Sequence, residues 1–152
     1  NSSKQEMKFN AVVGNPPYQM MDGGAQASAT PVYNLFVDTA RALKANYISM
    51  IIPARWYSGG KGLDEFRISM LEDQHISRLD DFLNPETVFP NTNIRGGLCF
   101  FLWDSSYNSN EQKTRVVSHD STGVVSDTMR TLKTNNIDTF IRSYEAISMS
   151  PL

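Results

Sequence analysis

The chain has 152 residues, which suits one domain, and 40% of them are hydrophobic, enough for a substantial core. Its formal net charge of −2, from 14 Lys and Arg against 16 Asp and Glu, lacks the basic excess of a chain that grips nucleic acid by charge alone. A single cysteine excludes a disulfide framework and favours a reducing compartment, while the absence of an apolar run of ~18–20 residues or a secretory leader pattern argues against a membrane helix or an exported protein.

The first predicted element is a strand over residues 8–13, apolar enough to be buried on both faces. After one glycine come the four residues that say most about chemistry, Asn15-Pro16-Pro17-Tyr18. Each proline fixes its φ and lacks an N–H, so the asparagine side-chain oxygen and the first proline's carbonyl can both point outward as acceptors. The tyrosine ring adds a flat face for stacking. Two acceptors beside such a face suit an amino group on a heteroaromatic ring, such as N6 of adenine.

A loop and a helix are predicted next. Residues 19–30 are small, polar and glycine-bearing, which is typical of a mobile loop. Thr30 and Pro31 then supply a helix N-cap and a proline at the first helical position. Apolar residues recur at helical spacing after them, so we expect a helix over residues 31–45 that packs on a sheet.

Two strands and a second helix follow. A strand over residues 47–52 ends at Pro53, and the loop over residues 58–62 lacks the Gly-Lys-Ser/Thr of a phosphate loop. Apolar spacing predicts a helix over residues 62–73, and the next apolar run predicts a strand over residues 76–82. This alternation indicates an α/β fold with right-handed crossovers and a mostly parallel sheet.

The last strong strand is predicted over residues 97–103. The region before it, residues 84–93, contains only turns and leaves no room for a helical crossover. The strand is therefore expected to run antiparallel, inserted between the two strands that precede it. Since ligands of open α/β sheets lie outside the carboxyl ends of the strands, Asn15, the loop over residues 53–62 and the turn at Phe89 should share one rim.

After residue 104 the residue pattern of the sequence changes. A polar turn, a further strand, a weakly patterned stretch and a final amphipathic helix are predicted, in that order, over residues 105–110, 113–118, 119–135 and 137–147.

The ordered series of motifs resembles the amino-group DNA methyltransferases, and most closely the adenine-N6 methylases of bacterial type II restriction–modification systems. The resemblance covers roughly residues 7–104. It is carried by five segments: Phe9-Asn10-Ala11-Val12-Val13-Gly14-Asn15-Pro16-Pro17-Tyr18-Gln19, Pro31-Val32-Tyr33-Asn34-Leu35-Phe36, Ile51-Ile52-Pro53-Ala54-Arg55-Trp56, Val88-Phe89-Pro90 and Ile94-Arg95-Gly96-Gly97-Leu98-Cys99-Phe100-Phe101-Leu102-Trp103.

The resemblance implies a bacterial cytoplasmic enzyme that flips an adenine out of double-stranded DNA and methylates it from S-adenosyl-L-methionine, with no metal and no membrane. Catalysis would fall to Asn15, Pro16, Pro17 and Tyr18, with Tyr18 and Phe89 stacking on the base. Asn15, Pro17 and Phe36 would border the cofactor. Four basic residues are weaker candidates for DNA phosphate contacts: Arg55, Lys61, Arg67 and Arg95.

The family's sheet has seven strands, and its first three carry the cofactor. Only 14 residues precede Asn15, so we expect strands four to seven of a Rossmann-like class I methyltransferase sheet without the cofactor-binding half. The first strand would then have a bare apolar edge, which the missing half, a partner chain or a second copy would cover. We expect residues 1–104 to form the catalytic half-domain, inactive alone, and residues 105–152 to lead toward a recognition domain.

Other readings remain open from the sequence. The same four residues occur in enzymes that methylate RNA or a protein glutamine. The chain could also serve as a non-catalytic binding or assembly module, and the Asn-Pro-Pro-Tyr segment could be an ordinary turn or a polyproline ligand.

Overall fold

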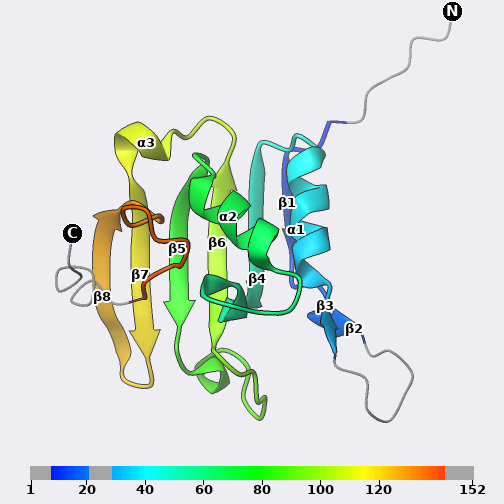
Figure 1. Cartoon of the computed structure of the whole chain (residues 1–152), viewed down its shortest axis with the longest axis vertical. Helices are drawn as coiled ribbons and strands as arrows, with labels where there is room; N and C mark the ends of the chain where they lie inside the picture. Colours follow the sequence, from blue (N-terminus) through cyan, green and yellow to red (C-terminus); the bar gives the residue numbers. More distant parts are fainter. Residues whose placement is uncertain (1–7, 21–28, 143–152) are drawn as a thin grey trace, which may run out of the picture.

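A six-stranded sheet forms the centre of the structure, a computed structural model that describes residues 8–20 and 29–142 (Figure 1). In their order across the sheet, the strands are β1 (Ala11–Gly14), β4 (Tyr47–Pro53), β6 (Leu98–Asp104), β5 (Ile76–Phe82), β7 (Thr114–Asp120) and β8 (Gly123–Arg130). A small separate ladder joins β2 (Gln19–Met20) to β3 (Thr30–Pro31). The helices are α1 (Tyr33–Ala42), α2 (Asp64–Glu72) and α3 (Ser109–Gln112), with short 3₁₀ turns η1 (Ala54–Tyr57) and η2 (Pro85–Thr87).

The position of β6 confirms the prediction for the strand at residues 97–103. It lies between β4 and β5 and runs antiparallel to both. In register, Ile48 of β4 and Ile76 of β5 both lie opposite Trp103. The connection from β5 to β6 contains only η2 and turns, which allows a reversal of direction but no helical crossover.

The expectation of a mostly parallel sheet is wrong. Of the five strand pairings in the described sheet, only β1 with β4 and β5 with β7 are parallel. The inserted β6 converts two pairings to antiparallel, and the tight β7–β8 hairpin adds a third. The sheet is therefore mixed, although β1, β4, β5 and β7 still end at the same side of the molecule.

The core lies between the sheet and one layer of helices. Alternate residues of β4, namely Ile48, Met50 and Ile52, are buried toward α1 and α2, which Figure 1 shows on the same face of the sheet. Trp56 of η1 lies with its ring centroid 5.8 Å from that of Phe66 of α2. Each such buried side chain contributes about 1.5–3 kcal/mol to folding. Trp56 and Trp103 are core residues.

The opposite face of the sheet is less well covered. On β4 and β6 the alternate side chains Ile51, Phe100 and Leu102 are only partly buried. At the edge of the sheet, Val13 of β1 is 76% exposed, and no strand of the described chain pairs with the outer edge of β1. An apolar strand with a free edge is a surface that other chains pair with.

The start of α1 differs from the prediction. Thr30 and Pro31 do not cap the helix, because they form β3 and pair with Gln19 and Met20. The helix begins at Tyr33 without a side-chain cap. Part of the predicted loop over residues 19–30 is thus an antiparallel ladder, and residues 21–28 lie outside the described part.

The C-terminal part also differs. The strand expected at residues 113–118 is β7, but β8 was missed within the stretch regarded as weakly patterned. The predicted final helix is wrong over residues 137–142, which are not helical, and its remainder lies outside the described residues. Both strands continue the sheet that β1 begins, and the division at residue 104 stays a prediction.

None of the helices in the described chain is long and apolar enough to cross a membrane.

Candidate active site

The Asn-Pro-Pro-Tyr segment follows β1 directly, at the carboxyl end of the strand. Pro16 is buried, while Asn15 and Pro17 on either side of it are exposed. Tyr18 is partly buried against the core, and its carbonyl accepts a 3.2 Å hydrogen bond from the Val32 N–H. One buried proline ring and one backbone bond therefore hold the segment so that the asparagine amide faces outward.

The Tyr18 hydroxyl is shielded from solvent and has no partner with hydrogen-bond geometry among the described residues. Burial raises the pKa of Tyr18, and the neighbouring Asn15 amide offsets part of that rise. The phenol is therefore neutral and able to donate. Buried polar groups almost always have partners, so this hydroxyl, which lies next to the Asn15 amide, is a candidate for a ligand contact.

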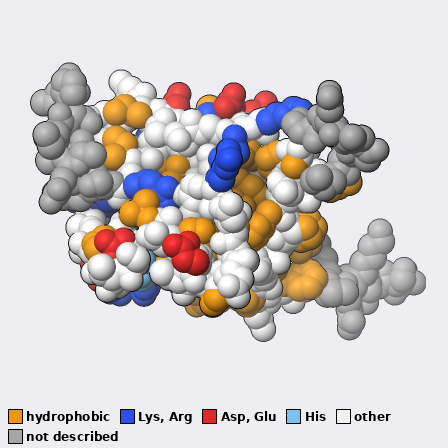
Figure 2. All heavy atoms as spheres, turned by 90° about the horizontal axis from the view of Figure 1, so that it is seen from below, with side chains coloured by type: hydrophobic (Ala, Val, Ile, Leu, Met, Phe, Trp, Pro, Cys, Tyr) orange, Lys and Arg blue, Asp and Glu red, His pale blue; other side chains and the backbone are white. Residues whose placement is uncertain are grey.

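A pocket of about 620 Å³ opens beside Tyr18. It lies where β1 and β4 end and β6 begins, at the end of the molecule that Figure 2 views, where Lys and Arg side chains stand among hydrophobic ones. Its lining comes from segments far apart in sequence: Tyr18, Gln19, Ala29, Pro31, Tyr33, Pro53, Arg55, Lys61, Asn93, Ile94 and Arg95. The strand ends bring these segments together, as expected for an open α/β sheet.

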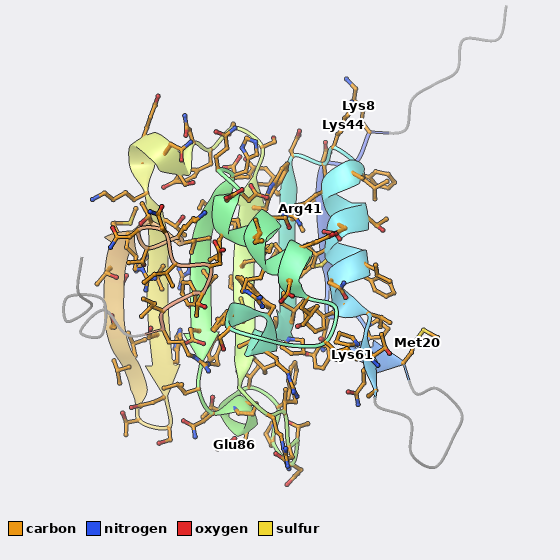
Figure 3. The ribbon with its side chains drawn as sticks, in the orientation of Figure 1. Lys8, Met20, Arg41, Lys44, Lys61 and Glu86 are labelled. Atoms are coloured by element: carbon orange, nitrogen blue, oxygen red, sulfur yellow. The ribbon has the colours of Figure 1, made fainter. Side chains whose placement is uncertain are left out.

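Three of the four basic candidates line this pocket. Arg55 follows β4, Lys61 lies on the loop before α2, and Arg95 precedes β6. Figure 3 shows Lys61 at the same end of the molecule as Met20 of β2. Arg55 and Arg95 are exposed, and neither side chain donates a hydrogen bond within the described chain. Together they give the pocket a positive rim although the chain as a whole is slightly acidic.

Arg67 does not belong to this group. Its guanidinium donates to the carbonyls of Asp138, Trp56 and Gly59, and it also pairs with the Asp64 carboxylate. Its side chain is only 11% exposed. These contacts tie α2 to η1 and to the C-terminal segment, so we do not carry Arg67 forward as a DNA-binding residue.

Tyr33 lines the pocket and was missed as a site residue. It is 2% exposed, yet its hydroxyl has no partner with hydrogen-bond geometry among the described residues. Burial raises its pKa and Cys99 adds to the rise, while the Trp56 backbone and Arg55 oppose it. A tyrosine at the start of the helix that follows the Asn-Pro-Pro-Tyr segment was the available signal, but Tyr33 entered the sequence analysis only as part of a motif segment.

Two aromatic candidates lie outside the pocket lining. Phe89 is partly buried in the turn after η2, on the same connection as Asn93 and Arg95. Phe36 is 46% exposed on α1 and lines a separate apolar groove of about 340 Å³, with Val12, Leu35, Thr39, Ala40, Leu43 and Met50. Base stacking by Phe89 and a cofactor contact by Phe36 therefore stay predictions.

Comparison with known proteins shows which family has a similar sequence. Residues 1–89, more than half of the chain, match the Eco57I restriction-modification methylase family. The chain belongs to this family. The match includes the Asn-Pro-Pro-Tyr segment, α1, β4 and the turn at Phe89, and it confirms the resemblance to restriction–modification methylases that the motifs indicated.

One curated relative is described as an uncharacterized adenine-specific methylase of Mycoplasma pneumoniae. It is 33% identical to this Eco57I-family chain over 104 residues, which are 66% of the chain but 25% of the relative. The chain thus spans about a quarter of the length of the curated protein it matches.

Solved structures support the fold. The methyltransferase subunit of a type I restriction-modification system from Streptococcus thermophilus matches 97% of this chain with 32% of its own, at a TM-score of 0.52 and 13% identity. The type IIG restriction endonuclease BpuSI matches 72% of this chain with 15% of its own chain, at a TM-score of 0.51 and 17% identity. At such identities the likeness shows a shared mixed α/β fold, compatible with part of a Rossmann-like sheet.

Proposed function

We propose that this chain is the base-activating part of a DNA methyltransferase that methylates N6 of adenine within a restriction–modification system. The observation that carries the proposal is the position of Asn15 and Pro16, directly after β1 and beside the pocket that Tyr18 lines. No described residue donates a hydrogen bond to the Pro16 carbonyl. The family match supports the reaction class.

The two acceptors would act on the amino group of a flipped adenine. The N6 lone pair is delocalised into the ring and is a weak nucleophile. Hydrogen bonds from N6–H to the Asn15 side-chain oxygen and the Pro16 carbonyl would draw the nitrogen toward tetrahedral geometry and localise the lone pair. As positive charge develops on N6, these fixed acceptors stabilise it more than they stabilise the planar ground state. The proton then leaves N6 to solvent, so no buried base is required.

The pocket would supply the binding energy for the flipped base. Flipping costs a few kcal/mol of lost stacking. Stacking on Tyr18 would return about 1–3 kcal/mol, and the turn that carries Phe89 could add a second ring from the other side. The hydroxyl of Tyr33, which has no partner with hydrogen-bond geometry among the described residues, is a neutral donor suited to a ring nitrogen of the base.

S-adenosylmethionine would supply an electrophilic methyl group on a sulfonium sulfur. The described residues fit only its apolar parts, because the groove beside Phe36 is lined almost wholly by apolar side chains. Its one hydroxyl group, on Thr39, already donates to the Leu35 carbonyl at 2.8 Å. Partners for the ribose and amino-acid ends would come from the rest of a longer protein, which would also cover the open edge of β1.

Double-stranded DNA is the proposed substrate. Arg55, Lys61 and Arg95 would contact phosphates next to the flipped base, which positions the duplex without reading its sequence. A short basic rim on a chain with a net charge of −2 suits this limited role, and sequence recognition would fall to another part of the protein.

The product of the reaction tests the proposal. Full-length protein is incubated with S-adenosylmethionine carrying a labelled methyl group and, in parallel, with duplex DNA of varied sequence, total RNA and a glutamine-containing protein substrate. Mass spectrometry of the digested substrates is expected to find label only as N6-methyladenine in DNA. Label in RNA or on a glutamine amide would move the enzyme to another methyltransferase class, and no transfer to any substrate would favour a binding or assembly module.

A further inference from the structure

An ion pair between Arg142, which is partly buried, and Asp81, which is buried, lies outside the Asn-Pro-Pro-Tyr segment and outside the pocket lining. The Asp81 carboxylate at the end of β5 is 1% exposed, and the Arg142 guanidinium donates to both of its oxygens, at 2.9 Å from Nε and 2.6 Å from Nη2. The Tyr57 hydroxyl donates to the same carboxylate at 3.1 Å, and the arginine lies 5.1 Å from the centre of the Tyr57 ring. This bidentate pairing with Asp81 fixes the orientation of the Arg142 guanidinium.

The third donor of the guanidinium reaches a turn of the chain. Arg142 Nη1 donates to the Gly96 carbonyl at 2.6 Å. Gly96 and Gly97 both have φ of +87°, a conformation that favours glycine, and a Cβ on Gly97 would lie 2.1 Å from the Phe82 carbonyl oxygen. The turn thus packs directly on the end of β5, where the arginine holds it.

This turn also connects the two pocket arginines. Arg95, which lines the pocket, is the residue before Gly96. On the other side, the Gly97 carbonyl accepts a 3.0 Å bond from the Ala54 N–H, and Ala54 precedes Arg55, which also lines the pocket. One fixed turn therefore sets the separation of Arg55 and Arg95.

We propose that Arg142, held by Asp81 and Tyr57, is a positioning residue that fixes the Gly96–Gly97 turn and thereby places Arg95 and Arg55 for the phosphates of the substrate DNA. This role rests on the proposed function for its ligand, but the fixing of the turn does not. It assigns a function in substrate binding to a residue 46 positions after the turn it holds.

Backbone exchange tests the fixing of the turn in the full-length protein. Hydrogen–deuterium exchange is followed in peptides covering residues 93–98 for wild type, Arg142→Lys and the control Arg115→Ala. Arg115 forms an exposed pair with Asp127, away from the pocket. Arg142→Lys keeps the charge but cannot bond Asp81 twice and Gly96 as well, so we expect exchange in this segment at least about tenfold faster, with Arg115→Ala unchanged. Wild-type exchange in the lysine variant would overturn the proposal.

A mutant cycle tests the effect on DNA. Affinity for duplex DNA is measured for Arg142→Lys, for a variant with both Arg55→Ala and Arg95→Ala, and for the triple variant. If Arg142 acts through the positions of Arg55 and Arg95, Arg142→Lys weakens binding on its own, and the triple variant binds within about twofold of the variant that lacks the two pocket arginines. A triple variant that loses affinity by the product of the two separate factors, or unchanged binding by Arg142→Lys, would overturn the proposal.

Tyr57→Phe provides a milder variant if Arg142→Lys does not fold, because it removes one hydroxyl from the Asp81 carboxylate and keeps the arginine. It is expected to raise exchange in residues 93–98 by a smaller factor, and an unchanged rate would count against the proposal. A wild-type protein that does not bind or methylate DNA would contradict the proposed function, while the exchange experiment still decides whether Arg142 holds the turn.

Discussion

Neighbouring residues of the Asn-Pro-Pro-Tyr segment have opposite exposure, and this difference explains how a short segment can be rigid and reactive at once. Pro16 is buried, so its ring anchors the backbone. Asn15 is exposed, so its amide remains available for a ligand. Tyr18 lies between these cases, with a ring that packs on the core and a hydroxyl without a partner among the described residues. Each residue's role in the proposed reaction follows from its burial.

The ring of Tyr18 should matter more than its hydroxyl. Tyr18→Ala in the full-length protein removes the stacking face, worth about 1–3 kcal/mol, and is expected to lower methylation roughly 10- to 100-fold. Tyr18→Phe keeps the face and removes only an unpartnered hydroxyl, so it should cost least and leave the melting temperature unchanged or higher. Initial rates and thermal melts check this, and a larger loss for phenylalanine than for alanine would contradict the stacking role.

Substitutions of Arg95 and Arg67, two arginines with different surroundings, should have opposite effects. Arg95→Ala should weaken DNA binding by the full-length protein without changing its stability, because the side chain is exposed on the pocket rim. Arg67→Ala should instead lower the free energy of unfolding by about 1–3 kcal/mol, since it removes three hydrogen bonds to backbone carbonyls, and leave DNA affinity of the folded protein unchanged. Urea titration and a DNA-binding assay are applied to both variants. Loss of stability in Arg95→Ala together with loss of DNA affinity in Arg67→Ala would contradict the prediction.

The sequence predicted the chemistry of the candidate site more fully than its contacts. Asn15, Pro16, Pro17 and Tyr18 were predicted because two acceptors and a ring at a strand end suit an amino group and because the segment resembles the methylase motif. Arg67 and Arg55 looked alike in sequence, and only the fold distinguishes the arginine that bonds to three backbone carbonyls from the one on the pocket rim. Tyr33 was missed because a residue that is almost wholly buried can still line a pocket with part of its side chain.

At the scale of elements, local patterns identified strands well and element ends poorly. The antiparallel insertion of β6 follows from the short connection before it, which is a property of the sequence. The start of α1 was wrong because Thr30 and Pro31 suit a helix start and a β-ladder equally, and pairing with Gln19 and Met20 decides between them. β8 was missed because its more buried alternate positions, Ser126, Thr128 and Arg130, are polar, so the strand shows no apolar alternation and exists through its hairpin with β7.

The outer edge of β1 leads to a prediction about association. A protein limited to these 152 residues should self-associate through this edge, and Val13→Lys should shift it toward monomer because it places a charge on an exposed apolar strand. Val124→Lys is the matched control, since Val124 is 59% exposed on β8 at the other edge of the sheet. Light scattering measures the mass. A monomeric wild type, or loss of association only in the β8 variant, would contradict the prediction.

Considered as a whole, the molecule combines a pocket at the strand ends with an open strand edge and an apolar groove beside Phe36. These features suit a part of a larger fold, in agreement with a chain that spans about a quarter of its curated relative. A homodimer and a covering segment of the same protein both remain proposals for what occupies the edge.

The isolated chain should bind the cofactor poorly. Calorimetry with S-adenosylmethionine is expected to give a Kd of about 1 mM or weaker for residues 1–152, because the groove beside Phe36 offers apolar contact and few polar partners. The full-length protein should bind far more tightly. Low-micromolar binding by the isolated chain would show that the described residues hold a complete cofactor site, and it would overturn the half-domain interpretation.

The central claim, that the Asn15 side chain activates an adenine amino group, is tested most directly by the single-turnover rate of DNA methylation in Asn15→Ala full-length protein. Asn15 is exposed, so the variant should melt at the wild-type temperature. Loss of one of two acceptors on N6 should lower the rate at least about 10²- to 10³-fold, measured as N6-methyladenine formed on saturating DNA and cofactor. A folded Asn15→Ala protein that methylates adenine at the wild-type rate would contradict the account and reduce the segment to a turn.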